Sequence, residues 1–171
     1  AKYLYLDNGT TTTERYAFSK RFKLKPNTKY TLSGWFYMYD KCPSVDIWVL
    51  NSKDREESDT STGYDYASRF VGNFTTTNTW KYYTWSITTQ TDAITGYLRI
   101  DVNGYNANGT SPFNRFCWNS LMLNEGDAQP WTPHPSEVYE GNTIIDANGV
   151  TINNGAITIK NNDGQTQLEG D

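Results

Sequence analysis

Hydrophobic and polar residues alternate along several stretches of this chain, with the period of two that is typical of β-strands. In the stretch 30–39, one face carries Leu32, Phe36 and Met38, and the other carries Ser33, Trp35, Tyr37 and Tyr39. Large side chains are present on both faces. The pattern therefore predicts a strand with one face in a core and an aromatic face left over.

Two further stretches have the same period. Residues 45–50 alternate Val45, Ile47 and Val49 with Asp46, Trp48 and Leu50, and residues 97–103 alternate Leu98, Ile100 and Val102 with Tyr97, Arg99, Asp101 and Asn103. Each stretch has an aliphatic face for a core and a second face of polar or aromatic residues. Additional strands are predicted at 15–24, 68–74, 80–88 and 116–123, separated by loops such as 51–64 and 104–112.

The composition agrees with a β-protein. The chain contains 23 Thr and 17 Asn, which favour strands and turns over helices. The spacing of the predicted strands indicates an all-β sandwich. The proline-rich segment 129–135 cannot continue a strand or a helix. We therefore expect a sandwich domain over residues 1–135 and a separate β-rich tail over residues 136–171.

The tail has short apolar runs between turn-forming pairs. These pairs are Asn148-Gly149, Asn154-Gly155 and Asp163-Gly164, which are strong signals for β-hairpins. About 30 residues in two or three strands bury too little surface to be stable alone. We expect the tail to pair with copies of itself or with a neighbouring part of a longer protein.

Charge and hydropathy argue against two classes of partner. The net charge is −4 with a pI near 5.0, and no cluster of Lys or Arg lies along one predicted strand, so nucleic acid is not an expected partner. No apolar run approaches the roughly 20 residues that span a bilayer, and Ala1-Lys2-Tyr3 does not begin a signal peptide. We expect a soluble chain without membrane insertion.

Three segments carry a resemblance to a known family: residues 25–38 (KPNTKYTLSGWFYM), 79–89 (TWKYYTWSITT) and 120–137 (SLMLNEGDAQPWTPHPSE). Together they resemble the jelly-roll carbohydrate-binding modules of families 4 and 9, in the version found in tail and baseplate proteins of phages that infect Gram-positive bacteria. The match runs from Tyr16 to Ser136. The phrase at 145–152 in the tail also resembles phage structural proteins.

The resemblance implies a jelly-roll β-sandwich that binds host cell-surface polysaccharide without catalysis. It further implies a place in the virion, similar to that of accessory baseplate proteins of lactococcal and streptococcal phages, with other baseplate or tail proteins as partners. The alternative is a structural or protein-interaction module of the tail that binds no glycan. A glycoside hydrolase fragment is the weakest alternative, because no nucleophile, base or carboxylate pair stands out.

Exposed aromatic rings beside polar groups are the residues that a sugar site needs. Sugars offer C–H faces that stack on rings, and hydroxyls that pair with planar polar groups. If the strands of Trp35, Trp48 and Arg99 share a sheet, their outward residues line one concave face. The predicted ligand-binding residues are then Trp35, Tyr37, Tyr39, Trp48, Tyr97, Arg99 and Asp101. For each ring, packing under a loop or at a protein interface is the alternative.

Three more tryptophans need separate interpretation. In the strand 116–123, Leu121 and Leu123 alternate with Trp118 and lie on the same side as Cys117. These two leucines favour the Cys117 side as the core side, which would expose Trp118 as a further ligand-binding residue. Trp80 begins a strand at a scaffold position of the family. Trp131 lies between prolines and is expected to plug the end of the sandwich.

No cofactor is predicted. His134 lies between two prolines, and no Cys or His stands at metal-ligand spacing from it. The related modules often hold a structural calcium ion between the first and the closing strand, for which Asp7, Glu125 and Asp127 are the candidates. Cys42 and Cys117 either form one disulfide or stay separate. The spacing of a single pair of cysteines does not decide between these alternatives.

Overall fold

The computed structural model describes residues 2–72, 74 and 78–133, together with the backbone of four strands in the tail. Every regular element in these residues is a β-strand. None of the described residues belongs to a helix long and apolar enough to cross a membrane. The chain divides into two compact units, Ala1–Thr132 and Pro133–Asp171.

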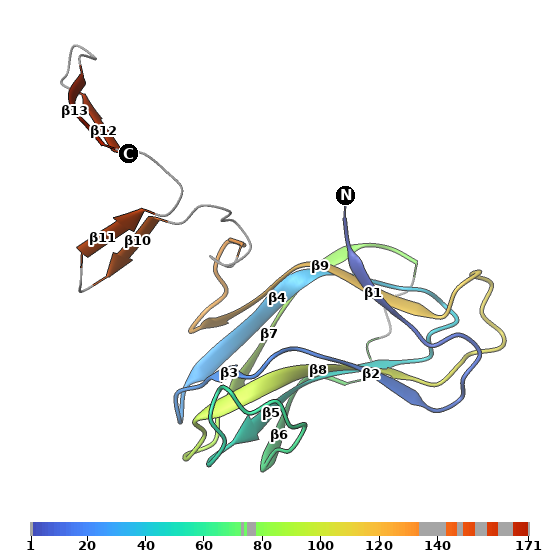
Figure 1. The fold of residues 1–171 in the computed structure, drawn as a ribbon. Coiled ribbons are helices and arrows are strands. Elements are labelled where there is room, and N and C mark those ends of the chain that lie inside the picture. Colours follow the sequence, from blue (N-terminus) through green and yellow to red (C-terminus); the bar gives the residue numbers. More distant parts are fainter. Residues whose placement is uncertain are drawn as a thin grey trace. The chain divides into compact units, whose positions relative to one another are not determined.

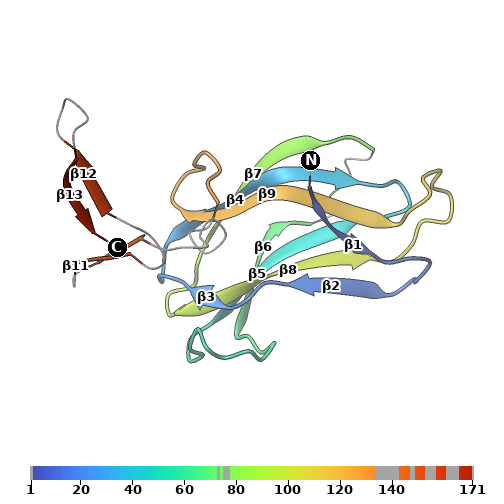
Figure 2. The ribbon, with the colours of Figure 1, turned by 45° about the horizontal axis from the view of Figure 1, so that its top comes forward.

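The strands of the first unit form two antiparallel sheets (Figures 1 and 2). The strands are β1 (Leu4–Asp7), β2 (Glu14–Phe18), β3 (Phe22–Lys23), β4 (Lys29–Met38), β5 (Val45–Ser52), β6 (Tyr66–Val71), β7 (Lys81–Thr88), β8 (Thr95–Asn103) and β9 (Arg115–Glu125). One sheet, the β4 sheet, has the order β1-β9-β4-β7. The other, the β8 sheet, has the order β2-β8-β5-β6, with β3 also paired to β8.

This strand order confirms the predicted all-β jelly roll. Strands β4, β5, β7, β8 and β9 alternate between the two sheets, and every pair of neighbours in these sheets except β5–β6 joins strands that are not consecutive in the chain. Strand β1 was not predicted from the sequence. It pairs with β9 from Leu4 opposite Trp118 to Asp7 opposite Arg115.

The core lies between the two sheets and is built from the predicted aliphatic faces. Its most deeply buried residues include Leu32, Phe36, Met38, Val45, Ile47, Val49 and Val102. Aromatic rings fill its centre, where Phe36 stacks on Phe116 with ring centroids 5.6 Å apart. The period-two patterns of β4, β5 and β8 are therefore confirmed on their inward sides.

Strand β9 departs from a simple alternation, and this makes the prediction for Trp118 wrong. Trp118 is 8% exposed and belongs to the core. Between Ser33 and Trp35 of β4, the partners on β9 jump from Met122 to Asn119, so β9 contains one extra residue. This bulge shifts the phase of the strand, because an extra residue reverses which positions face inward. Both Trp118 before the bulge and Leu121 after it thus contact the core.

The two cysteines are free thiols. Cys42 belongs to the core cluster, whereas Cys117 alternates with the inward residues Phe116 and Trp118 and lies on the opposite side of its sheet. Burial raises the pKa of Cys42 to about 12 and that of Cys117 to about 11. Both thiols are therefore protonated and unreactive at neutral pH.

The tail contains two short hairpins. Strand β10 (Thr143–Asp146) pairs with β11 (Gly149–Ile152), and β12 (Ile157–Lys160) pairs with β13 (Thr166–Gly170), each antiparallel. His134 and the turn at 163–164 lie outside the described residues. A lone two-stranded hairpin is only marginally stable in water, so each hairpin needs further packing partners.

Truncation tests what the tail packs against. We expect the full chain to self-associate and a chain cut after Ser136 to remain a folded monomer, because the described core lies in the first unit. Light scattering of both chains measures this. If both are monomeric and the tail resists proteolysis in the full chain, the tail does not act through association between chains.

Candidate functional site

The predicted ligand-binding residues do not line one face. Trp35 and Tyr37 belong to β4 and Tyr39 follows it, whereas Trp48 belongs to β5 and Arg99 to β8. Strands β4 and β5 lie in different sheets. Because the outer faces of a sandwich point away from each other, these residues form two separate surfaces. The prediction of one shared concave face is therefore wrong.

The first surface is the outer face of the β8 sheet, which we call the β8 face. It consists of Glu14, Tyr16, Phe18, Asp46, Trp48, Arg69, Arg99 and Asp101. The strand register places Phe18, Arg99, Trp48 and Arg69 in one row across the sheet, and Tyr16, Asp101 and Asp46 in the next row. Rings and charged groups alternate along the first row, so that each ring adjoins a group able to hydrogen bond.

The arginines of the β8 face hold its rings in place. The Arg99 guanidinium carbon lies 5.0 Å from the ring centroid of Tyr16 and 5.9 Å from that of Trp48. Arg69 lies 5.4 Å from the Trp48 centroid. Such cation–π contacts fix the orientation of both partners before a ligand arrives.

An ion pair anchors Arg99 to the sheet. Its Nε lies 2.9 Å from Oδ1 of Asp101, whose side chain is 3% exposed. Burial raises the pKa of Asp101 to about 6, although the charge of Arg99 acts in the opposite direction. Asp101 is therefore too buried to contact a ligand directly. Its role on this face is to position Arg99, which corrects its prediction as a binding residue.

Tyr97 is also unavailable to a ligand. It is 3% exposed, and its hydroxyl donates a hydrogen bond of 2.5 Å to the carbonyl of Thr62. The segment 53–65 covers this end of the β8 face, which the alternation in the sequence does not reveal. Of the predicted residues in β5 and β8, Trp48 and Arg99 are the partly exposed ones.

Arg21 fixes the covering segment 53–65 through its guanidinium. It donates to the backbone carbonyls of Asp59, Ser61 and Gly63 and to the hydroxyls of Ser52 and Thr95, at 2.9–3.2 Å. These contacts use every N–H of the guanidinium. The same group lies 5.2 Å from the ring centroid of Tyr97.

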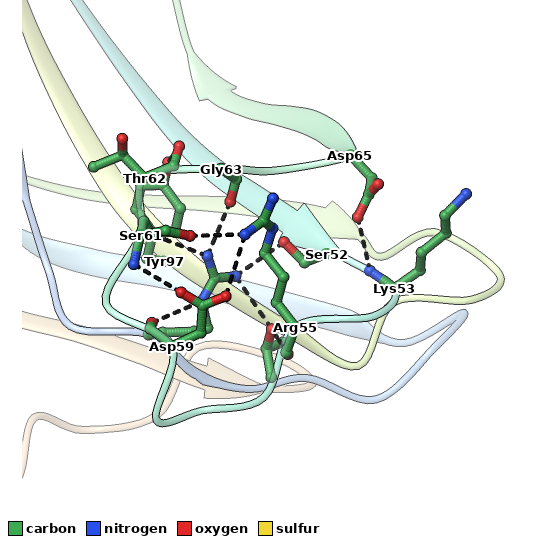
Figure 3. A network of polar contacts seen from close by, with 11 residues as sticks. Ser52, Lys53, Arg55, Asp59, Ser61, Thr62, Gly63, Asp65 and Tyr97 are labelled. Carbon is green, nitrogen blue, oxygen red and sulfur yellow. Dashed lines mark hydrogen bonds and ion pairs between the residues drawn. The ribbon is translucent and has the colours of Figure 1, made fainter.

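Contacts within the segment add to this anchor (Figure 3). Arg55 pairs with Asp59 at 3.2 Å and donates to Ser61 at 2.8 Å, and the backbone N–H of Lys53 donates to Asp65 at 3.0 Å. The fixed segment borders a hollow of about 540 Å³ that Phe18 and Tyr97 also line. Phe18 thus joins this hollow to the row of rings and charges.

The second surface is the outer face of the β4 sheet, which we call the β4 face. Its rings and amide are those of Tyr3, Tyr5, Trp35, Tyr37, Tyr39, Trp80, Tyr82, Phe113 and Asn119. Its charged residue is Arg115, whose guanidinium carbon lies 4.4 Å from the ring centroid of Tyr5 and 3.7 Å from that of Phe113. Trp35 is 44% exposed, and its ring centroid lies 5.7 Å from that of Tyr82. Tyr37 contacts Tyr39 at 4.9 Å and Trp80 at 5.6 Å.

The structure also changes the interpretation of two tryptophans that were expected to be structural. Trp80 is partly exposed and contributes its ring to the β4 face, where it contacts Tyr3 and Tyr37. Trp131 is exposed, so it does not plug the end of the sandwich.

The candidate calcium ligands do not meet. Asp7 pairs with Arg115 at 2.6 Å, Glu125 with Lys25 at 2.8 Å, and Asp127 with Lys29 at 2.5 Å. Asp7 lies beside the start of β9 and Glu125 at its end, about 33 Å away at the rise of a β-strand. Among the described residues, no group of three or more His, Cys, Asp or Glu side chains is arranged to hold a metal ion.

Sequence reasoning missed several residues of the β8 face. Tyr16 and Phe18 are 42% and 48% exposed and alternate with the partly buried Ala17. That alternation was readable in the predicted strand 15–24. Arg69 and Asp46 were placed on strands by the sequence, but only the register brings them beside Trp48 and Asp101.

Comparisons with known proteins identify similar folds only. No protein-family model matches the chain, and no curated protein matches it. Among solved structures, a Family 16 Carbohydrate Binding Module-2 is 21% identical with a TM-score of 0.46, covering 71% of this chain and 74% of that one. A structure described as "CBM4 structure and function" is 15% identical with a TM-score of 0.46, covering 72% and 71%.

A structure of infectious bursal disease virus, Gt strain, is also similar. It is 12% identical with a TM-score of 0.49, and the match covers 72% of this chain and 29% of that one. All three identities are below 25% and all three TM-scores are below 0.5. These similarities therefore identify no ligand for this chain.

Replacing Arg21 tests the anchor of the covering segment. We expect Arg21→Met to lower the free energy of unfolding by about 2–3 kcal/mol, because several buried acceptors lose their donor. Trypsin should then cut faster at Lys53 and Arg55. Lys20→Met, at the neighbouring exposed position, is the matched control and should behave as the wild type. Equal resistance of all three proteins to trypsin would contradict the role of Arg21.

The burial of Asp101 predicts a pH dependence of stability. Its pKa of about 6 lies above the ordinary value of 3.8, so the folded protein binds this proton more readily than the unfolded chain. This contribution to stability is full below the ordinary value and is lost as the pH rises through 6.

Thermal unfolding of the wild type and of Asp101→Asn at two pH values measures this contribution. Between about pH 7 and about pH 5, we expect the wild type to gain about 1 kcal/mol relative to the variant, which corresponds to a few degrees in Tm. A relative loss on acidification would mean that Arg99, rather than burial, dominates the pKa of Asp101.

Proposed function

We propose that this protein is a non-catalytic carbohydrate-binding module whose ligand lies across the β8 face. The observation that carries the proposal is the row of Phe18, Arg99, Trp48 and Arg69, with Tyr16 beside it. Exposed rings supply stacking surfaces for the C–H faces of sugars, and guanidinium groups between them donate hydrogen bonds to hydroxyls.

Unused polar atoms on this face support the proposal. Nε1 of Trp48 and Oδ1 of Asn103 are buried and have no hydrogen-bond partner within the described part of the chain. Buried polar atoms in native proteins nearly always have a partner. A hydroxyl group of a bound saccharide would give Nε1 of Trp48 an acceptor.

The hollow beside Phe18 indicates in which direction a bound ligand extends from the row. It continues the row of rings toward the segment 53–65, where Ser58, Thr60 and Ser61 line it with hydroxyls. A chain of several sugar units therefore fits better than a single sugar. The fixed geometry of the segment, held by Arg21, lowers the ordering cost of binding.

The same face argues against catalysis. Asp46 and Asp101 are cross-strand neighbours, which would suit a pair of catalytic carboxylates. However, Asp101 is buried and paired with Arg99, so it cannot reach a glycosidic oxygen. Asp46 lies 3.9 Å from Arg69, and Glu14, an exposed carboxylate of the same face, accepts a hydrogen bond from the Tyr16 hydroxyl. Each of these carboxylates thus has a partner on the face, and we infer binding without hydrolysis.

We further propose that the module serves adhesion in a phage tail or baseplate, at the surface of a Gram-positive host. Support comes from the resemblance of residues 16–136 and of the tail to such proteins. Self-association through the tail hairpins would place several modules on one particle, so that weak individual sites gain avidity. The partners are then host cell-surface polysaccharide and other tail or baseplate proteins.

Alanine variants test the β8 face. We expect Tyr16→Ala and Phe18→Ala each to weaken polysaccharide binding about tenfold, because a stacked ring supplies much of the binding energy of such a site. Both rings are exposed, so Tm should change little. Trp131→Ala, another exposed ring outside both faces, is the matched control and should bind as the wild type.

A glycan array, followed by titration with cell-wall polysaccharide from lactococcal and streptococcal strains, measures the binding. If the wild type binds no glycan on the array and no host cells, the alternative of a structural tail module gains support. Binding that is unaffected by both variants would place the sugar elsewhere on the protein.

A further inference from the structure

The β4 face contains a hollow of its own. It measures about 420 Å³ and is lined by Tyr3, Trp35, Trp80 and Asn119. This volume lies within the range of small-molecule sites. The hollow is on the sheet opposite the β8 face, so it is not an extension of the site proposed above.

The aromatic rings that line the hollow are tilted against the rings next to them. Tyr3 meets Trp80 edge to face, with ring centroids 5.6 Å apart and an angle of 65° between the planes. Trp35 is tilted by 53° against Tyr82, and Trp80 by 53° against Tyr37. Each lining ring thus contacts another ring, while Tyr3 and Trp35 keep nearly half of their surface exposed.

The bulge in β9 brings an amide into the hollow. Asn119 stands directly opposite Trp35 in the register, and the next residue, Ser120, has a φ of 50°. This left-handed conformation is uncommon for a residue with a side chain. The Asn119 amide has no hydrogen-bond partner among the described residues, so its donor and acceptor are both free.

We propose that this hollow is a second carbohydrate site, which takes one or two units of an uncharged sugar. The rings offer stacking surfaces, and the Asn119 amide offers one donor and one acceptor to vicinal hydroxyls. None of the four lining residues carries a charge, in contrast to the arginines and aspartates of the β8 face. The hollow therefore offers no charged partner to an anionic ligand.

A protein partner fits this surface less well. Protein interfaces are broad and flat and bury about 800 Å² on each side. The rings of Tyr3 and Trp80 meet at 65° beside the hollow, so this surface is not flat. With sites on both outer faces, a single module would hold two glycan strands at once.

Indole N–H signals in NMR spectra of the full chain test this site. The signals of Trp35 and Trp80 are assigned with Trp35→Phe and Trp80→Phe. Cellobiose, lactose and N,N′-diacetylchitobiose are added up to tens of millimolar, the range of weak single sites. We expect at least one of these sugars to shift both signals to saturation, and sodium glucuronate to leave them in place.

Variants then separate this site from the β8 face. Asn119→Ala and Asn119→Asp should each weaken the sugar about tenfold through the lost hydrogen bonds. Thr84→Ala, exposed on the same sheet outside the hollow, and Trp48→Ala, on the other face, should leave the affinity unchanged. The proposal is overturned if no uncharged probe moves the two signals in the folded protein. It is equally overturned if they move with protein concentration alone, which would indicate a second copy on this face.

Discussion

Strand β9 is the longest strand of the sandwich and contains one extra residue, a β-bulge. It buries hydrophobic side chains both before and after this bulge. Without the bulge at Ser120, either Trp118 or Leu121 would face water, because a strict alternation cannot turn both inward. Strand β9 is paired on both sides, with β1 and with β4, so its phase determines how the whole β4 sheet covers the core. The bulge requires Ser120 to adopt a left-handed backbone conformation, which is energetically unfavourable for a residue with a side chain.

The same irregularity shapes the surface. By reversing the phase, it turns Asn119 outward beside Trp35 and buries Trp118 beneath the sheet. On the opposite sheet, no bulge interrupts the pairing of β5 with β8, so that Trp48 and Arg99 stay in register. The two faces thus differ in chemistry, because the β8 face alternates rings with charged groups, whereas the hollow of the β4 face is lined by rings and one amide.

Period-two alternation was sufficient to predict the all-β class, the inward residues of β4, β5 and β8, and the approximate limits of most strands. It was insufficient for the site, because sheet membership depends on pairings between distant segments. Strands β4 and β5 are consecutive in the chain, yet they lie in opposite sheets. Tyr97 is buried because the segment 53–65 covers it. Arg21, which lies between β2 and β3, fixes that segment by hydrogen bonds, and no local sequence pattern reveals contacts between such distant residues.

We propose that a saccharide lies across β2, β8 and β5 on the outer face of their sheet. Backbone amide shifts in NMR spectra, recorded while cell-wall polysaccharide fragments are added, test it most directly. The largest shifts are predicted in Glu14–Phe18, Val45–Ser52 and Thr95–Asn103. Shifts confined to loops at the ends of the sandwich, or to the tail, would contradict the claim.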